Sequence, residues 1–408
     1  MHHPEKYIAR GFDTPGRCRE FTDKVYSGAN DDPAALARDI FSIEKKYYPP
    51  PPEYTLYFGE LHGHSNLSDG RTDIDRYFTS IRDRAELDFA ALADHDHGGI
   101  GRPELWKAGK WELIQEKVRQ YYQPGRFTTI LGYERDSYPW YNNLVVYYDS
   151  DHGEMLRGVH DGEITRNELA EWLRRPDLLL VPHDTYQLSA GCDFNSIPPE
   201  LMPRLLEILS RGDCAEYFDH PVSREGDTCC RGGTWQDALA RGGRIGVIAG
   251  SDDHLGHNGL ITTELPEPKH PGIYKGLNKY PGITGVWARE NTREAIFEAL
   301  KARRCYGFMG GRMRMDFRIN GHWMGEEITL EAGEPRVIWF DFSADSPVAS
   351  VTLVKNNQDY ILWRKNSRQL FFDYRQELPV DCYYLRAITQ DGRWCWSSPV
   401  WVAAPGKR

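Results

Sequence analysis

Histidine and acidic residues follow several short apolar segments of this 408-residue sequence, each at the point where the segment ends. TLYFGE (55–60) is followed by His62-Gly63-His64 and then Asp69, and DFAALA (88–93) by Asp94-His95-Asp96-His97. The remaining three pairs are FTTILG (127–132) with Glu134, DLLLVP (177–182) with His183-Asp184, and RIGVIAG (244–250) with Asp252-Asp253-His254. Imidazoles and carboxylates are common ligands of divalent metal ions, so these segments predict a metal centre.

The first of these motifs has the spacing that one ion requires. Residues two apart on a strand point to the same side, so His62 and His64 can reach a common ion. Asp69 follows in a loop that ends at a glycine and can fold back over the same place. A single H-x-H or Asp-His pair is a weak signal, whereas five such strand ends together are a strong one. Imidazole and carboxylate donors without a thiolate favour Zn, Mn or Fe over Ca.

A repeated strand-and-helix pattern between residues 54 and 308 is expected to position these side chains. Short apolar runs, which also include NLVVYY (143–148) and LLEIL (205–209), alternate with amphipathic stretches at 73–86, 111–122, 165–174 and 234–241. Continuous apolar strands favour a parallel sheet that is covered on both faces. About 250 residues of such units is the usual size of a TIM-type barrel, in which all strand ends meet at one face.

The rest of the chain predicts two further regions. Residues 1–53 form an N-terminal extension with a helix-like stretch at 32–46 and a stiff four-proline linker at 49–52. Residues 54–314 contain the predicted metal-binding barrel. Residues 315–408 are rich in strand-like segments, such as RVIWFDFS (336–343) and YYLRAIT (383–389), separated by Asn-Gly and Asp-Gly turns. This pattern predicts a small antiparallel β-sandwich.

Composition narrows the possible partners. Lys and Arg number 50 and Asp and Glu number 60, so the formal net charge is −10. An acidic chain is a poor binder of long duplex nucleic acid or of anionic membranes, and no apolar run is long enough to span a bilayer. The chain opens without an apolar signal segment, so we expect a cytoplasmic protein. The eight cysteines contain no C-x-x-C pair and are expected to be reduced.

Taken in order, the motifs ELHGHSNLSDG, ALADHD, GYE, VPHD and GSDDH resemble those of the polymerase-and-histidinol-phosphatase (PHP) superfamily of metal-dependent phosphoesterases. Residues 292–317 and 383–402 also resemble a bacterial PHP-like family of unknown function. The resemblance covers residues 54–402. It implies an α/β fold, a PHP-type distorted (β/α)7 TIM-like barrel with a C-terminal β-sandwich-like domain. It also implies two or three divalent ions (Mn, Zn or Fe) at the C-terminal face of the barrel.

The resemblance also implies an allocation of ligands. His62 and His64 would bind one ion with Glu134 and Asp252. Glu134 would bridge to a second ion that His183 also holds. A third position would take Asp69, His95 and His254.

Two positions depart from the superfamily pattern. Asp184 stands where a second histidine is usual, and Ser210-Arg211-Gly212 lacks a later histidine. Glu207 or Glu216 is a possible substitute, although a solvated carboxylate is the preferred interpretation of both. A full set of three ions is therefore in question.

The implied reaction is hydrolysis of a phosphoester by a metal-activated hydroxide, with a small phosphorylated molecule or a short oligonucleotide as substrate. Arg304, or alternatively Arg135 or Arg71, would grip a phosphate oxygen through its planar guanidinium group. Asp96, His97, Asp184 and His257 are the candidates for the acid that protonates the leaving group. The Tyr138-Pro139-Trp140-Tyr141 segment is a candidate wall for a base or sugar ring.

Two other functions are compatible with the residues. Amidohydrolase-type barrels also begin with H-x-H and cleave amides or lactones, but the Asp-His pairs and the early SNLSDG segment (65–70) favour the PHP pattern. A degenerate, non-catalytic barrel that binds a partner or a glycan is the other alternative, and it would hold no metal.

Overall fold

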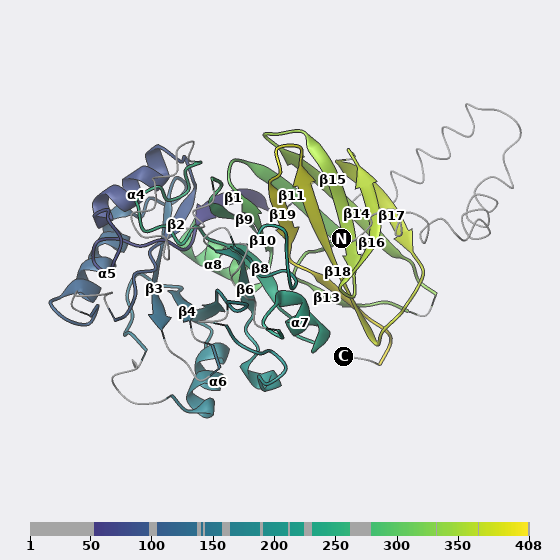
Figure 1. Ribbon diagram of the computed structural model, residues 1–408, viewed down its shortest axis with the longest axis horizontal. Coiled ribbons are helices and arrows are strands. Elements are labelled where there is room, and N and C mark those ends of the chain that lie inside the picture. The colour runs from purple at the N-terminus through teal and green to yellow at the C-terminus, as the bar shows by residue number, and fades with distance from the viewer. Residues whose placement is uncertain are drawn as a thin grey trace, which may run out of the picture.

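The structure is a computed structural model that describes residues 53–97, 104–136, 140–141, 143–156, 164–187, 191–210, 213–223, 231–261, 279–331, 333–365 and 367–406. The expected N-terminal helix at 32–46, the prolines at 49–52, Arg211 and the Tyr138-Pro139 pair lie outside these residues. The fold is mixed α/β, with many strands and few helices (Figure 1). None of the described helices is long and apolar enough to cross a membrane.

Parallel strands lie at the centre of the N-terminal part. β1 (Thr55–Glu60), β2 (Phe89–Ala91) and β3 (Thr128–Asp136) are adjacent and parallel, and β6 (Leu205–Ser210) and β8 (Gly246–Ala249) form a second parallel pair with the short β7 (Asp213–Cys214) beside β6. Most of their side chains are buried, which explains why their sequences are continuously apolar. The strands predicted from the sequence are therefore present, with small shifts at their ends.

One bridge joins the two sheets, and a second extends the pairing of β2 with β3. Gly63, after β1, pairs in parallel with Asp253, after β8, and His95, after β2, pairs in parallel with Glu134 of β3. His64 donates its backbone N–H to the carbonyl of Asp253 at 3.0 Å. The carboxyl ends of β1, β2, β3 and β8 therefore meet at one place, where the predicted ligands follow.

The helices begin at polar caps that the sequence contains. α4 (Ile74–Asp83) is capped by Asp73, while α6 (Arg166–Arg174) and α7 (Trp235–Ala240) are capped by Thr165 and Thr234 in reciprocal capping boxes. Thr292 caps α8 (Arg293–Lys301), and α5 (Lys110–Tyr121) begins after Gly109. Each of these helices buries an apolar face against the sheets, as the amphipathic pattern predicted.

The sheet is not wholly parallel, which corrects one expectation. β4 (Asn143–Tyr148) is antiparallel to both β3 and β5 (Leu178–Pro182), and β9 (Gly282–Ala288) is antiparallel to both β1 and β10 (Cys305–Met309). Six residues join β3 to β4, too few for the crossover that a parallel pair needs. The sequence pattern did not predict β9, which lies beside β1.

The C-terminal part is β-rich, as expected, and its strands lie in two sheets. One sheet has the order β12 (His322–Trp323), β11 (Met313–Ile319), β14 (Arg336–Ala344) and β17 (Arg368–Asp373). The others are β13 (Glu327–Thr329), β15 (Val348–Lys355), β16 (Gln358–Arg364), β18 (Val380–Thr389), β19 (Trp394–Ser397) and β20 (Val400–Ala403). They join the N-terminal strands through an antiparallel pairing of β10 with β19, so one 13-stranded sheet runs through both parts.

Candidate metal centre

The segment that follows β1 is held by backbone bonds to the segment that follows β8. The carbonyl of His62 accepts the backbone N–H of Asp252 at 2.7 Å, next to the Gly63–Asp253 bridge. Position 63 has to be glycine, because a Cβ atom there would come within 2.2 Å of the Asn258 side chain. This close approach fixes the imidazoles of His62 and His64 against the residues that follow β8.

Glu134 lies at the centre of the predicted ligands. Its carboxylate is 1% exposed and lies within 3.4 Å of four imidazole nitrogens. The shortest contact, 2.6 Å, joins its Oε1 to Nε2 of His183, while Oε2 lies 3.1 Å from Nδ1 of His95 and 3.4 Å from Nε2 of both His62 and His64. One carboxylate therefore contacts histidines from three different strand ends, which is the position of a bridging ligand.

Asp252 connects the two sides of the cluster. Its Oδ1 lies 2.9 Å from Nε2 of His64, 3.5 Å from Nδ1 of His254 and 3.7 Å from Nε2 of His62. Its backbone φ is +47°, and that of Asp184 is +53°. Residues other than glycine rarely adopt this left-handed backbone conformation, and such strain tends to occur at functional sites.

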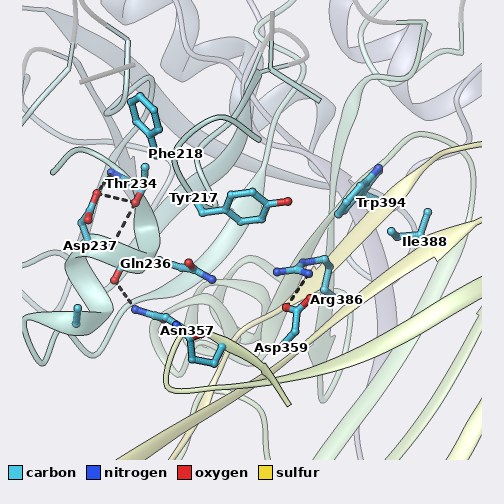
Figure 2. A pocket seen from close by; sticks show the side chains of 12 residues that line it. Tyr217, Phe218, Thr234, Gln236, Asp237, Asn357, Asp359, Arg386, Ile388 and Trp394 are labelled. Carbon is cyan, nitrogen blue, oxygen red and sulfur yellow. Dashed lines mark hydrogen bonds and ion pairs between the residues drawn. The ribbon is translucent and has the colours of Figure 1, made fainter. Parts of the chain in front are cut away.

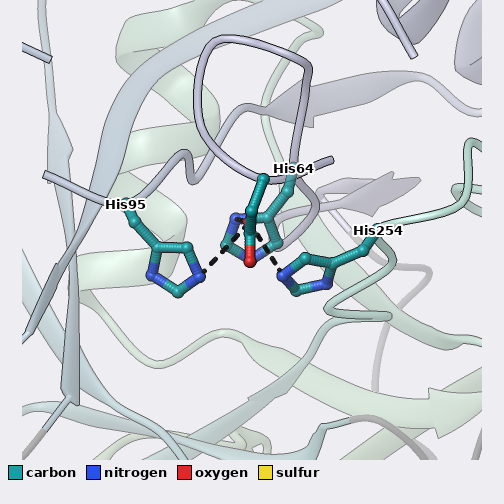
Figure 3. Close-up of side chains that lie close together, drawn as sticks. His64, His95 and His254 are labelled. Atoms are coloured by element: carbon teal, nitrogen blue, oxygen red, sulfur yellow. Dashed lines mark ion pairs between the residues drawn. The ribbon is translucent and has the colours of Figure 1, made fainter. Parts of the chain in front are cut away.

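A second group lies around Asp69. The rings of His64 and His254 are stacked at 4.0 Å, those of His64 and His95 at 4.4 Å, and Figure 3 shows the three rings turned toward one another. Oδ1 of Asp69 lies 3.1 Å from Nε2 of His254 and 3.6 Å from Nε2 of His95. The loop after β1 thus returns to the cluster, as its length and glycine suggested.

The structure brings all eight predicted metal ligands into this one cluster. Within the described residues, the cluster contains four overlapping groups, and the donor atoms of each group lie within 4.8 Å of one another. They are His64-Asp69-His95-His254, His62-His64-Glu134-Asp252, His62-His183-Glu207 and His183-Asp184-Asp252. The second group has the residues that the PHP resemblance implied for one ion, and the first adds His64 to the three residues implied for another. The remaining two groups contain residues outside that allocation.

Glu207 is the residue whose environment the sequence interpretation missed. The side chain is buried on β6, not solvated, and its Oε2 accepts a 2.8 Å hydrogen bond from Nδ1 of His62. Position 250 is glycine because a Cβ atom there would lie 2.4 Å from Cβ of His62 and 2.7 Å from Oε1 of Glu207. A glutamate inside the apolar run LLEIL was the available signal, since burial of a carboxylate requires a partner. Glu216, the other suggested substitute, lies in a different buried cluster.

Charge and burial have opposite effects on the pKa of Glu134 and of His62, and they act together on that of His64. Burial would raise the pKa of Glu134, but His95 and His183 outweigh it and hold that pKa well below its usual value. Burial would lower the pKa of His62, but the carboxylates of Glu207 and Asp252 raise it to about 10. Burial, together with His254 and His95, lowers the pKa of His64. Adjacent imidazoles are thus driven in opposite directions.

These residues fit a divalent cation. Among the described residues, several buried atoms of the cluster have no hydrogen-bond partner: His64 Nδ1, His183 Nδ1, Asp184 Oδ1 and Glu207 Oε1. Buried polar atoms without partners are costly, and a cation among them supplies the missing interaction. The donors are nitrogen and oxygen without sulfur, which suits Zn, Mn or Fe.

A buried carboxylate holds the loop between His64 and Asp69 in place. Asp94 accepts hydrogen bonds from the backbone and the hydroxyl of Ser65, at 2.8 and 2.6 Å, and from the hydroxyl of Ser68 at 2.5 Å. Burial raises its pKa although these bonds oppose the shift. Asp94 is therefore a positioning residue, and its place in the Asp94-His95 pair was the signal for it.

The predicted catalytic residues are distributed over three environments. Asp184 is buried beside His183, with its Oδ2 3.8 Å from Nδ1 of that histidine. Asp96 is buried and lies 3.5 Å from the guanidinium group of Arg135, which is itself buried. His257 lies outside the cluster, where its backbone N–H donates to the carboxylate of Asp253 at 2.6 Å.

Arg304 is not brought to the cluster. It precedes β10, which runs parallel to β1 because both pair antiparallel with β9, so Arg304 lies at the amino end of these strands. Its guanidinium group bonds the carbonyl of Trp287 and the carboxylate of Glu298 and lies over the ring of Tyr54 at 4.1 Å. Its proposed role as the phosphate-gripping residue is therefore corrected, because these contacts occupy the group at the opposite end.

A basic cavity lies beside the cluster instead. Its volume is about 320 Å³, and its walls include Arg71, Arg76, Arg84 and His257. It is built by the chain segments that directly follow Asp69 and His254, and the backbone N–H of Arg71 donates to the carbonyl of His254 at 2.9 Å. The three guanidinium groups have no ion-pair partner within the described part of the chain, while Asp73, the one carboxylate in the wall, caps α4.

Comparison with known sequences finds distant relatives of unknown function. The model of the family described as "Protein of unknown function (DUF3604)" matches residues 269–335. Uncharacterized proteins of Chlamydia pneumoniae and Chlamydia trachomatis are each 24% identical to this chain, over 371 and 384 residues. Both alignments cover 85% of this chain and 57% of the relative, so the chain spans a little over half the length of these curated relatives.

Comparison with solved structures finds likeness at low identity. One crystal structure, a two-domain protein from Bacteroides vulgatus containing a predicted PHP-like metal-dependent phosphoesterase, is 14% identical and covers 88% of this chain and 98% of its own, with a TM-score of 0.43. Fibronectin(III)-like modules of Clostridium thermocellum CbhA are 15% identical, cover 23% of this chain and 94% of their own, and have a TM-score of 0.19. At these values the matches define neither a family nor an activity for the chain.

Proposed function

We propose that the protein is a metal-dependent phosphoesterase that hydrolyses a small phosphorylated substrate or a short oligonucleotide. The observation that carries the proposal is the buried Glu134 carboxylate with four imidazole nitrogens within 3.4 Å. Such a concentration of donors at the carboxyl ends of parallel strands is the usual form of a catalytic metal site in α/β enzymes. The ordered motifs quoted above favour the PHP-type distorted (β/α)7 barrel, with a β-sandwich-like C-terminal domain, as the architecture.

The ligands of the ions are the eight clustered residues, with Glu207 as a positioning partner. His62, His64, Glu134 and Asp252 hold one ion, and Asp69, His95 and His254 complete another with His64. His183 would bind an ion beside Glu134. Asp184 occupies the position where the superfamily pattern has a histidine. Divalent ions bound there supply a Lewis acid that activates water and neutralises the charge of a phosphate group.

The chain itself supplies the recognition of an anionic substrate. Arg71, Arg76 and Arg84 leave three guanidinium groups available in the cavity beside the cluster, and guanidinium is the side-chain group best matched to phosphate oxygens. These arginines take the role that the sequence analysis gave to Arg304. An amide or lactone substrate would have no use for this concentration of positive charge, so we favour a phosphoester over the amidohydrolase alternative.

His257 is the residue that we propose as proton donor to the leaving group. It lines the arginine cavity and is partly exposed, whereas Asp96 is buried beside Arg135. The backbone bonds to Asp253 hold the Gly256-His257 segment in place, at 2.7 and 2.6 Å. The partly exposed imidazole of His257 can therefore exchange protons with water.

The test is hydrolysis of chromogenic phosphate monoesters and diesters by the full chain supplied with Mn, Zn or Fe. We expect turnover with at least one metal, lost when a chelator is added and when Glu134 is replaced by Gln. An exposed carboxylate on α5, Glu112, provides the matched control as Glu112→Gln, which is expected to retain activity. Absence of turnover of every ester with every metal would contradict the phosphoesterase proposal.

A further inference from the structure

A second cavity lies away from the metal centre, between the N-terminal part and the C-terminal strands. Its volume is about 750 Å³. One wall comes from the segment after β7 and from α7, and the other from the β15–β16 turn, β18 and β19 (Figure 2). Pockets of about 300–1,000 Å³ are the usual size for organic ligands larger than a single ion or a metabolite fragment. No part of the proposed reaction uses it.

Aromatic side chains form the apolar surface of this cavity. Phe218 is 43% exposed, and Figure 2 shows the partly exposed ring of Tyr217 between Phe218 and the partly exposed Trp394. Trp394 is held in place from behind, because it stacks on Trp396 at 6.0 Å and meets the edge of His220 at 4.6 Å. A rigid aromatic surface is ready to receive the flat face of a ring without a cost in side-chain order.

The floor of the cavity is a buried ion pair. The carboxylate of Glu216 accepts hydrogen bonds from Nε of Arg386 at 2.8 Å, from the hydroxyl of Tyr384 at 2.6 Å and from the indole of Trp396 at 2.7 Å. Nη1 of Arg386 also donates to Asp359 at 3.0 Å. Two carboxylates therefore match the single charge of Arg386, and its guanidinium group is not available to bind an anion.

The charges around the cavity disfavour both kinds of ion. Asp237 and Asp359 line it and would repel an anion. A cation fares no better, because the protein's own guanidinium groups already face the aromatic rings. Arg386 lies 5.4 Å from the ring centre of Tyr217, and Arg231 lies 4.6 Å from that of Phe218. A neutral ligand is left.

The cavity wall carries both donors and acceptors, because Gln358, Tyr217 and Trp394 bring N–H and O–H groups to it. The Nδ2 group of Asn357 donates to the carbonyl of Gln236, and Nε2 of Gln236 donates to the hydroxyl of Tyr384 at 2.7 Å. Gln358 and Asp359 line the same wall with an amide and a carboxylate. The cavity therefore offers polar groups beside aromatic faces, a combination that suits a ring carrying several hydroxyl groups.

We propose that this cavity is a carbohydrate-binding site, which takes a neutral sugar or short oligosaccharide. Its rings would stack on Trp394, Tyr217 and Phe218, and its hydroxyl groups would form hydrogen bonds with Gln236, Gln358 and Asp359. The site does not depend on the metal centre. It would hold a glycan, or the glycan part of a larger substrate, against the junction of the two parts of the chain.

The experiment is isothermal titration of the full chain with neutral cello-, xylo-, malto- and chito-oligosaccharides, in the presence of a chelator. At least one of these is expected to bind with a Kd in the micromolar to millimolar range. Trp394→Ala and Phe218→Ala are each expected to weaken binding about tenfold, the loss of one good ring contact. Phe218 is largely exposed, so its variant keeps the test valid if Trp394→Ala does not fold.

The matched control is Trp106→Ala, which removes a tryptophan that is 40% exposed on the N-terminal part and is expected to leave binding unchanged. Failure of every oligosaccharide to bind would overturn the proposal. So would equal affinity in the wild type and the Phe218→Ala variant, or tighter binding of choline or inorganic phosphate than of any saccharide to this cavity. Because the metal is removed, none of these results bears on the phosphoesterase proposal.

Discussion

Glu207 accepts a hydrogen bond from Nδ1 of His62, and this contact decides which nitrogen of that imidazole faces the cluster. Nε2 of the same ring lies 3.4 Å from Glu134 and 3.7 Å from Asp252. A carboxylate behind a histidine ligand fixes its tautomer and its orientation and makes it a stronger donor. His62 follows β1 and Glu207 lies within β6, 145 positions further along the sequence, a separation that no local motif describes.

Replacing Glu207 by Gln is expected to weaken metal binding about tenfold, and replacing it by Ala about 100-fold, as is usual for partners behind a ligand. The reason is that the amide still accepts the bond from His62 but carries no charge, whereas alanine leaves Nδ1 without a partner. Titration of chelator-treated protein with Zn or Mn measures both. Activity of the Gln variant should recover with excess metal. Wild-type affinity in both variants would show that Glu207 does not act through His62.

Replacing Glu134 by Gln is expected to lower kcat by about 100-fold or more, and added metal should not restore it. Four imidazoles lose the one carboxylate that contacts them all, so the cluster keeps its shape but not its charge balance. Hydrolysis of a chromogenic diester at saturating metal measures the effect. The contrast with Glu207→Gln, which metal rescues, separates a ligand from a positioning residue. Unchanged kcat in Glu134→Gln would remove Glu134 from the centre of the mechanism.

The arginine cavity predicts sensitivity to anions. In the double variant Arg76→Gln, Arg84→Gln, the inhibition constant of pyrophosphate is expected to rise about tenfold, because each charged hydrogen bond contributes about 1.5–3 kcal/mol and solvent offsets part of it. The neighbouring Arg82 is a control on the same helix, since it pairs with Asp83 at 2.6 Å outside the cavity. Pyrophosphate should inhibit the Arg82→Gln variant with the same inhibition constant as the wild type. Equal inhibition constants in all three proteins would show that the cavity does not bind phosphate.

The sequence was sufficient to place most of the strands, the helices α4 to α7 and the eight clustered residues, because each depends on local patterns. Continuous apolar runs and Asp or Thr caps mark elements, and a histidine after a strand marks its carboxyl end. The direction of β4 also follows from chain length once the six-residue connection is counted. Pairing between segments that are distant in the sequence does not follow from such local patterns. The place of β9 beside β1 and the burial of Glu207 result from contacts between distant segments.

Arg304 illustrates the same limit from the other side. Its position in a segment that resembles the PHP-like family suggested a role at the site, but a residue just before a strand lies at the amino end of that strand. Arg71, Arg76 and Arg84 had no motif to distinguish them, although they surround the cavity. Proximity in sequence to Asp69 was the available signal for Arg71, which the sequence analysis named as an alternative.

The buried network beneath the second cavity predicts a loss of stability in acid. Burial would raise the pKa of Glu216, but Arg386 and His220 outweigh it and lower that pKa from 4.5 to about 2. A carboxyl group whose pKa is lowered by folding stabilises the folded state at any pH above its pKa in the unfolded state. For Glu216 this contribution is about 3 kcal/mol, and it is lost as the pH falls from about 4.5 toward 2. Burial also lowers the pKa of His220, so protonation of that residue destabilises the fold in the same direction.

Urea denaturation at pH 7 and at pH 2.5 tests this prediction. Glu216→Gln should be less stable than the wild type at pH 7 by about 3 kcal/mol, because it leaves the Arg386 charge buried without its main partner. The difference should shrink as the pH is lowered, since the wild type also loses the charge. The exposed Glu112→Gln should change stability little at either pH. A Glu216→Gln variant as stable as the wild type at pH 7 would contradict the assignment.

The most direct measurement of the central proposal is the metal content of the purified full chain, prepared without added chelator or affinity tag and exchanged into metal-free buffer. We expect at least one equivalent of Zn, Mn or Fe per chain in the wild type and a clear loss in the Glu134→Gln variant. A wild-type chain that carries no such ion and takes none up from metal-replete buffer would show that the imidazoles and carboxylates around Glu134 do not form a metal centre.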